Sequence, residues 1–293
     1  MMNNVKGVIC AMITPRNGDG SVSIEGVKAL IDHLVESGVN VIFPTGSAGE
    51  GPLLTGKQKE EVIGAVMDAV DGRIAVTPGI TCTTTRETVE LGKACDDMGV
   101  DAVVAVTPWY YKMPDPDLLG FFRDLASSID SPIIAYKIPQ AAVNDISLGL
   151  LEKLSKLDGV DAIKDSSGDL VWLSKAITKH GDSLKFFGGN DRLILPCLSV
   201  GTSGHVSGTS NCFTEDVVDI WRHFSEGKLD SARSSQQLLL KKLMLLTPGK
   251  ENSAIREVLR RRGIETGEPL PPLGPLTADQ RELLARGLRS LGT

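Results

Sequence analysis

Lys164 has the clearest potential for chemistry in this chain, because it ends the apolar segment 159–163 and is followed at once by the polar run 165–169. An apolar segment of this kind predicts a strand. Lys164 would then lie at its carboxyl end, where barrels of parallel strands and alternating helices carry their catalytic groups. Partial burial there lowers the pKa of an amine and frees its lone pair for Schiff-base formation with a ketone. The alternative for this residue taken alone is a surface lysine in a strand-to-helix loop.

Three other segments have polar or aromatic residues directly after strand-like apolar runs. They are Pro-Thr-Gly-Ser-Ala-Gly-Glu at 44–50, Thr-Pro-Trp-Tyr-Tyr at 107–111 and Ala-Tyr-Lys-Ile-Pro at 135–139. In order and spacing, these segments and the lysine-bearing strand resemble the dihydrodipicolinate synthase/N-acetylneuraminate lyase family of pyruvate-dependent class I aldolases. The resemblance covers nearly the whole chain. The family's Gly-Thr-Thr-Gly-Glu motif stands here as Gly-Ser-Ala-Gly-Glu, and its Tyr-Asn-x-Pro motif as Tyr-Lys-Ile-Pro.

The resemblance implies a catalytic group of four residues. Lys164 would be the nucleophile, whose amine attacks the keto carbon of pyruvate or another 2-oxo acid and forms an iminium that accepts electrons when a carbon-carbon bond breaks. Tyr136, one strand-helix unit earlier, resembles the family's proton-shuttling tyrosine. Ser47 and Tyr110 match its relay partners, and Tyr110 would be inserted into the site of a neighbouring subunit.

The resemblance also implies the residues that bind substrate. The main-chain amides of Ser47 and Ala48 would hold the pyruvate carboxylate, since a glycine-rich loop after a strand can bind an anion and this one lacks the lysine of a P-loop. Gly189 and Val206 stand where the family closes its pocket over the substrate. Gly189 would permit a close backbone approach, and Val206 would only pack.

Ala141 determines which substrate we expect. It takes the position of an arginine that binds the second substrate's carboxylate in dihydrodipicolinate synthases, and a methyl group cannot replace charge-assisted guanidinium hydrogen bonds. An alanine here resembles 2-keto-3-deoxygluconate aldolases, whose aldehyde carries hydroxyls and no carboxylate. The leading hypothesis is therefore a lyase that reversibly cleaves a 2-keto-3-deoxy sugar acid, or a related hydroxylated 2-oxo acid, to pyruvate and an aldehyde. Lys137, in place of the motif's usual asparagine, fits neither group.

Two alternatives remain open. A 4-hydroxy-tetrahydrodipicolinate synthase, or a dehydratase of the same family, would share Lys164 and differ in the site for the second substrate. A non-catalytic sensor of 2-oxo acids is the alternative of another class, and the presence of Lys164, Tyr136, Ser47 and Tyr110 argues against it.

Composition excludes other classes of protein. A net charge of −6 offers no basic surface for nucleic acid, and no stretch of about 18 uncharged apolar residues could span a membrane. The amino terminus has no signal-peptide pattern, so we expect a cytoplasmic enzyme. The histidines and cysteines are scattered without metal-ligand or disulfide spacing, and we expect free thiols, no metal and no cofactor: His33, His180, His205, His223, Cys10, Cys82, Cys95, Cys197 and Cys212.

Periodicity predicts the elements that must position these residues. Short β-branched runs alternate with amphipathic stretches, which favours an α/β fold, a (β/α)8 TIM barrel. We expect eight strands, at 7–13, 39–43, 74–78, 102–107, 132–136, 160–164, 184–187 and 204–206. The helices named from the pattern are 24–37, 57–70, 84–98, 148–157 and 215–225, with Thr55 and Ser147 as caps.

After residue 227 only helical patterns remain, at 229–246, 252–262 and 278–288, the last separated by the proline-rich segment 269–275. This predicts a catalytic barrel at 1–226 and a C-terminal helical region at 227–293. The aromatic segment around Tyr110 is typical of an interface. By resemblance we expect a homotetramer built as a dimer of dimers.

Overall fold

Eight parallel strands form the centre of the computed structural model, which describes residue 2 and residues 4–292. The sheet runs in the order β3-β2-β1-β8-β7-β6-β5-β4. Main-chain hydrogen bonds from Val104 to Pro78 and from Ile80 to Val104 join the segment after β3 to β4, so the sheet closes into a barrel. The strands are β1 (Gly7–Ala11), β2 (Val41–Phe43), β3 (Ala75–Val76), β4 (Val103–Val106), β5 (Ile133–Lys137), β6 (Val160–Asp165), β7 (Lys185–Gly188) and β8 (Gly204–Ser207).

The side chains along each strand alternate between two environments. One set of side chains, which includes Val41, Ala162 and Phe187, fills the barrel interior. The next residue along each strand faces the helices, as Ile42 and Ile163 do. Because both faces are covered, the strands read as continuous apolar runs, and this is why eight of them could be predicted from the sequence.

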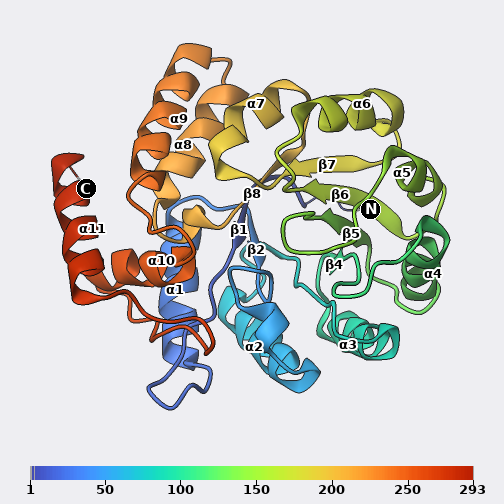
Figure 1. The fold of residues 1–293 in the computed structure, drawn as a ribbon, viewed down its shortest axis with the longest axis horizontal. Helices are drawn as coiled ribbons and strands as arrows, with labels where there is room; N and C mark the ends of the chain where they lie inside the picture. Colours follow the sequence, from blue (N-terminus) through green and yellow to red (C-terminus); the bar gives the residue numbers. More distant parts are fainter. Residues whose placement is uncertain (1, 3, 293) are drawn as a thin grey trace.

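Helices surround the barrel (Figure 1). Their bounds are α1 (Ile24–Glu36), α2 (Gly56–Val70), α3 (Thr85–Met98), α4 (Asp115–Ala126), α5 (Leu148–Leu154), α6 (Leu170–His180), α7 (Ile194–Ser199), α8 (Thr214–Ser225), α9 (Leu229–Leu243), α10 (Glu251–Arg261) and α11 (Ala278–Ser290). Single turns of 3-10 helix occur at Gly51–Leu53, Asp191–Leu193 and Thr209–Asn211. The predicted caps are confirmed, because Thr55 forms a capping box on α2 and the Ser147 hydroxyl accepts from the Leu150 amide at 3.0 Å.

The predicted (β/α)8 barrel with C-terminal helices is confirmed, with shorter elements at several ends. The third strand covers only Ala75–Val76, and the helix expected at 148–157 ends at Leu154. Three helices, α4, α6 and α7, were not named from the pattern. Among the described residues, no helix is both long enough and apolar enough to cross a membrane.

The C-terminal helices are attached to the barrel through a buried carboxylate, Glu50. The fully buried Glu50 side chain accepts from Arg256 Nη2 of α10 at 2.8 Å and from the Leu270 amide at 2.9 Å. Arg16 Nε lies 3.6 Å from Glu50 Oε2, the oxygen that accepts from the Leu270 amide. The same Arg256 nitrogen donates to the Thr14 carbonyl at 3.0 Å. One ionic cluster therefore joins the loop after β2, the end of β1 and the C-terminal region.

Glu50→Gln should destabilise the protein by about 3 to 5 kcal/mol, because it leaves two guanidinium groups buried without a counter-charge. Urea unfolding measures the change. Asp219→Asn is the matched control, since it breaks an ion pair of similar length, 2.6 Å to Arg222, whose partners are both largely exposed. That control should cost less than about 1 kcal/mol. Equal effects of the two variants would contradict the role given to Glu50.

Candidate active site

Lys164 lies at the carboxyl end of β6 inside the barrel, and Tyr136 of β5 is its direct partner in the strand register. The Lys164 side chain is 4% exposed. Its Nζ lies 3.5 Å from the centre of the Tyr136 ring and 4.8 Å from that of Phe43. Parallel pairing aligns the ends of β5 and β6, so the two side chains lie against each other in the barrel interior.

The surroundings of Lys164 favour its uncharged form. Burial lowers the pKa of the ammonium group below its ordinary value, and the neighbouring Tyr136 and Asp191 oppose this shift only in part. Within the described residues, no carboxylate lies within ion-pair distance of Nζ. The site therefore holds an amine that loses its proton more readily than an exposed lysine, as a nucleophile requires.

Ser166, which the sequence analysis did not identify, contacts the Tyr136 hydroxyl. Its hydroxyl lies 3.2 Å from Tyr136 Oη and 3.0 Å from the carbonyl oxygen of Gly189. A serine hydroxyl has one hydrogen and two acceptor sites, so it can donate to the carbonyl and accept from the phenol. Ser166 follows Lys164 by two positions in a run of polar residues typical of a strand-to-helix loop, and no local signal distinguished it.

Gly189 lies where a side chain would not fit. A Cβ added there would be 2.1 Å from Ser166 Oγ and 3.0 Å from Lys164 Cε. Val206 is 5% exposed and packs in the barrel interior, with Ala48 partly buried against the same cluster. These three predicted residues therefore lie around the same end of the barrel as Lys164.

The glycine-rich loop, residues 45–50, is bounded by two residues with left-handed backbone, Thr45 at φ 56° and Glu50 at φ 60°. Its close packing requires Gly49, since a Cβ there would lie 2.9 Å from the Met12 carbonyl oxygen. Ser47 is exposed at the tip of the loop. Among the described residues its hydroxyl has no hydrogen-bond partner, so a single chain does not link Ser47 to Tyr136.

Tyr110 and Ala141 both lie at the surface of the single chain. Tyr110 has φ 79° and is 82% exposed, with its ring packed edge-on against Tyr111 at 5.1 Å. Ala141 is exposed in the turn that follows β5. Among the described residues of one chain, Tyr110 therefore makes no hydrogen bond to Tyr136 or Ser47, the residues of the relay to which it was assigned.

Lys137, for which the sequence suggested no role, faces the helix layer and not the cavity. It follows Tyr136 on β5, so its side chain points to the opposite side of the sheet. Its ammonium group donates to Asp145 Oδ1 and lies 4.8 Å from the centre of the Trp172 ring. Lys137 thus fastens the β5–α5 loop (residues 138–147) to the barrel.

Asp191 is a second residue that the sequence analysis missed. Its carboxylate accepts from the Thr209 hydroxyl at 2.6 Å and the Thr209 amide at 3.0 Å, and its other oxygen lies 3.4 Å from His205 Nε2. Burial acts to raise the pKa of Asp191, but His205 and Thr209 outweigh it and hold that pKa below the ordinary range. His205, expected to be an ordinary core or surface histidine, is buried against this acid. In the part of the chain that the structure describes, no three His, Cys, Asp or Glu side chains are grouped closely enough to bind a metal.

A cavity of about 320 Å³ extends from Ser166 and Gly189 toward the C-terminal helices. Its polar wall consists of Gln140, Ser166, Gly189, Asn190, Asp191 and Thr209. The opposite wall comes from the C-terminal region, with apolar side chains of Leu243, Leu246 and Pro248 beside Glu251. Arg192, an exposed side chain, also borders this space. The polar wall offers several hydroxyl, amide and carboxylate groups to a hydroxylated ligand.

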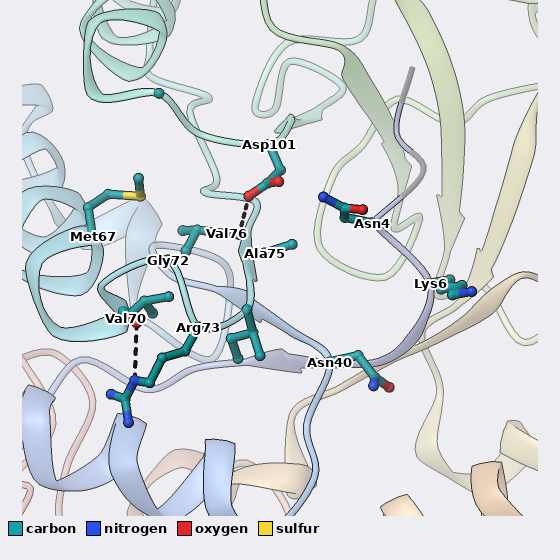
Figure 2. A pocket seen from close by; sticks show the side chains of 12 residues that line it. Asn4, Lys6, Asn40, Met67, Val70, Gly72, Arg73, Ala75, Val76 and Asp101 are labelled. Carbon is teal, nitrogen blue, oxygen red and sulfur yellow. Dashed lines mark hydrogen bonds between the residues drawn. The ribbon is translucent and has the colours of Figure 1, made fainter.

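A larger cavity, about 590 Å³, lies at the opposite mouth of the barrel, where segments that precede β1 to β4 meet (Figure 2). Two of its charged groups make structural contacts, one to a strand and one to a helix. Asp101 accepts from the Val76 amide at 2.9 Å, and Arg73 pairs with Asp32 at 2.7 Å. Catalytic groups of such barrels lie at the carboxyl ends of the strands. The smaller cavity beside Lys164 is therefore the candidate site.

Comparisons of the sequence and of the structure with known proteins point to the same family. The family profile described as "Dihydrodipicolinate synthetase family" matches residues 4–291. The chain is 34% identical over 286 residues to an uncharacterized DapA-like lyase of Halobacterium salinarum, covering 98% of this chain and 94% of the relative. It is 32% identical to a 4-hydroxy-tetrahydrodipicolinate synthase of Methanopyrus kandleri, covering 98% and 97%. A solved structure of YagE, an E. coli K12 prophage protein of the dihydrodipicolinic acid synthase family in complex with pyruvate, superposes with a TM-score of 0.94 at 26% identity, covering 98% and 99%.

Gly189→Ala should disturb the site and the fold together. The new methyl group must displace Ser166 Oγ and Lys164 Cε, which costs about 1 to 3 kcal/mol as overpacking. Gly120→Ala in α4 is the control, because a Cβ there meets nothing within 4 Å. It should be neutral, or stabilising by up to about 1 kcal/mol, since alanine favours helix. Thermal unfolding of both variants measures the difference, and a harmless Gly189→Ala would show that the close approach is not needed.

Proposed function

The chain belongs to the dihydrodipicolinate synthetase family, a family of carbon-carbon lyases, and on that premise we propose that it is a Schiff-base-forming class I aldolase. Its substrate would be a 2-keto-3-deoxy sugar acid or a related hydroxylated 2-oxo acid, cleaved reversibly to pyruvate and an aldehyde. The observation that carries the proposal is the buried Lys164 amine, which lies against the Tyr136 ring without a carboxylate partner among the described residues. The E. coli relative solved with pyruvate supports pyruvate as the common product.

The reaction would proceed in balanced steps. The Lys164 amine attacks the keto carbon and water leaves, which gives an iminium. Tyr136 removes the proton of the hydroxyl on C4, the C3–C4 bond breaks, and its electron pair moves into the iminium to form an enamine. The aldehyde departs. Protonation of the enamine at C3 and hydrolysis then release pyruvate and restore the amine.

The choice of a hydroxylated aldehyde is supported by the residue at position 141 and by the polar wall of the cavity. At position 141 a methyl group stands in place of a guanidinium, so no cation there would bind a second carboxylate. The polar wall, with Gln140, Asn190, Asp191 and Thr209, offers both donors and acceptors to sugar hydroxyls. Uncharged hydroxyls would satisfy these groups, whereas a carboxylate would lie near Asp191 and Glu251.

A 4-hydroxy-tetrahydrodipicolinate synthase is the second candidate function. The relative from Methanopyrus kandleri carries that name at 32% identity. Arg192 borders the cavity and could pair with the carboxylate of aspartate semialdehyde from the outer side. A dehydratase of the same family would use the same Lys164, and only an analysis of its products would distinguish it from the aldolase and the synthase.

The assembly belongs to the same proposal. Tyr110 can enter a proton relay with Tyr136 and Ser47 only if a neighbouring copy delivers it, because it is 82% exposed in its own chain. An exposed aromatic residue with left-handed backbone is unusual in a free surface loop. We therefore expect a homotetramer of two tight dimers, in which each Tyr110 completes the relay of its partner.

Pyruvate with borohydride should add one carboxyethyl group to Lys164, identified by mass spectrometry of the digested protein. Lys164→Met should abolish the label. Lys59 is the matched control, because it is also a buried lysine whose pKa is lowered by burial. Unlike Lys164, it donates from Nζ to a main-chain carbonyl, that of Thr81. Lys59→Met should keep the label. Labelling at Lys59 or elsewhere would refute the assignment of the nucleophile.

The pH dependence of trapping follows from the pKa of Lys164. Because burial holds that pKa below its ordinary value, the uncharged amine is present at lower pH than in an exposed lysine. The trapping rate should rise with pH and level off below the range in which exposed lysines titrate. A rate that still rises at the ordinary lysine pKa would show that the amine is not activated by burial.

Condensation of pyruvate with glyceraldehyde should be faster than with aspartate semialdehyde by about tenfold or more, since a lost charge-assisted hydrogen bond costs about 1.5 to 3 kcal/mol. Ala141→Arg should shift the ratio of kcat/KM values toward aspartate semialdehyde. Product analysis by mass spectrometry would also detect dehydration. A wild-type preference for aspartate semialdehyde would favour the synthase and refute the aldolase, while Lys164 labelling would remain valid for both.

A further inference from the structure

The Tyr110 segment, residues 107–113, is held by one side chain of the β5–α5 loop, that of Asn144. The amide nitrogen of Asn144 donates to the Pro108 carbonyl at 2.7 Å and to the Tyr111 carbonyl at 2.8 Å. Its amide oxygen accepts from the Met113 amide at 2.8 Å. The Asn144 main-chain carbonyl accepts from the Thr107 hydroxyl at 2.7 Å. Asn144 is fully buried, so its bond with Thr107 is shielded from water and the other three are shielded in part.

These bonds lie on both sides of a residue in a costly conformation. Tyr110 has φ 79°, and a left-handed bulky residue costs about 1 to 3 kcal/mol unless its surroundings fix it. The Tyr110 ring does not provide this, because it is 82% exposed and packs edge-on against the also exposed ring of its neighbour Tyr111. The bonds from Asn144 fix the carbonyl two residues before Tyr110 and the carbonyl one residue after it. The backbone conformation of Tyr110 is therefore held by Asn144 of the β5–α5 loop and not by contacts of its own side chain.

Asn144 is itself tied to the strand that carries Tyr136. The next residue, Asp145, accepts from the Lys137 ammonium group and from the Ile146 amide, the latter at 2.8 Å. Lys137 is 3% exposed and follows Tyr136 directly on β5. A continuous set of bonds thus runs from the strand of Tyr136 through the β5–α5 loop to the segment of Tyr110.

We propose that Asn144 is a positioning residue for catalysis, which holds Tyr110 in the conformation that a neighbouring copy's proton relay requires. This rests on the proposed function, in which Tyr110 completes the relay to Tyr136. Asn144 touches neither substrate nor the reacting atoms. Its effect is on turnover through Tyr110 and not on the formation of the Schiff base at Lys164, which needs no relay across the interface.

Two variants of Asn144 remove different parts of the contact. Asn144→Ala leaves two carbonyls and the Met113 amide without their partners. Asn144→Asp keeps the size of the side chain and the acceptor for Met113, but it replaces two donor contacts with repulsion between the carboxylate and the carbonyls of Pro108 and Tyr111. Asn144→Asp therefore tests the same contact with the smaller steric change, if the alanine variant folds poorly.

The test is a double-mutant cycle with Tyr110→Phe, measured as turnover in aldol cleavage. Each single variant should lower kcat by about 10²-fold, the lower end of the range for a positioned acid-base group. The double variant should lose no more than the single ones, because Asn144 acts only through the Tyr110 hydroxyl. Borohydride trapping of pyruvate should stay near the wild-type rate. Losses that multiply, or an Asn144 variant with wild-type kcat, would overturn the proposal.

Hydrogen-deuterium exchange supplies a readout that does not depend on activity. Peptides that cover residues 107–113 should exchange faster in both Asn144 variants, while the barrel strands keep their protection. Asn40→Ala is the control, since Asn40 also accepts from a main-chain amide, that of Val8 at 2.8 Å, but at the opposite mouth of the barrel. It should leave this exchange and kcat unchanged. Unaltered exchange of 107–113 in the Asn144 variants would contradict the role of Asn144, whereas full activity of Tyr110→Phe alone would contradict the proposed relay.

Discussion

The buried carboxylate of Glu50 is the interaction on which most of this structure depends. A charge with no exposed surface persists only with opposite charges and hydrogen-bond donors around it, and Glu50 obtains these from Arg16, Arg256 and the Leu270 amide. The glycine-rich loop can keep its left-handed residues because this cluster holds its end. The C-terminal region also borders the cavity beside Lys164, because α9 packs against α8 and the cavity wall includes Leu243 and Leu246.

A comparison of buried lysines shows why Lys164 differs from the rest. Lys242 pairs with Asp216 at 2.7 Å, and Lys137 pairs with Asp145, so each has a carboxylate that stabilises its charge. Lys59 donates to a carbonyl oxygen. In the described part of the chain, Lys164 alone among these four lies at the end of a barrel strand against aromatic rings and has no such acceptor. Burial without a counter-charge is costly for stability, and it is what makes an amine reactive.

The sequence was sufficient for the barrel and for the strand end of Lys164, because both follow from apolar runs and from motifs that are local. It was insufficient for contacts between elements. Asp191 and His205 are separated by a helix and meet only when β7 and β8 pair, and Ser166 reaches Tyr136 only because Gly189 leaves space for it. The helices left unnamed include α7, which is six residues long and contains a proline, too short for a periodic pattern.

Lys137 and Ala141 both depart from the family pattern, and neither departure lies on the face of β5 that carries Tyr136. Tyr136 points into the barrel and Lys137 points away from it, so a lysine at 137 cannot contact a substrate and instead fastens the β5–α5 loop through Asp145. Ala141 lies on that loop, which also holds Tyr110 through Asn144. On this loop Ala141 is exposed, whereas Asn144 is fully buried and hydrogen-bonded to the Tyr110 segment, so a substitution at 141 disturbs fewer contacts than one at 144. In the proposed function, position 141 would set the choice of substrate while Asn144 maintains the position of Tyr110.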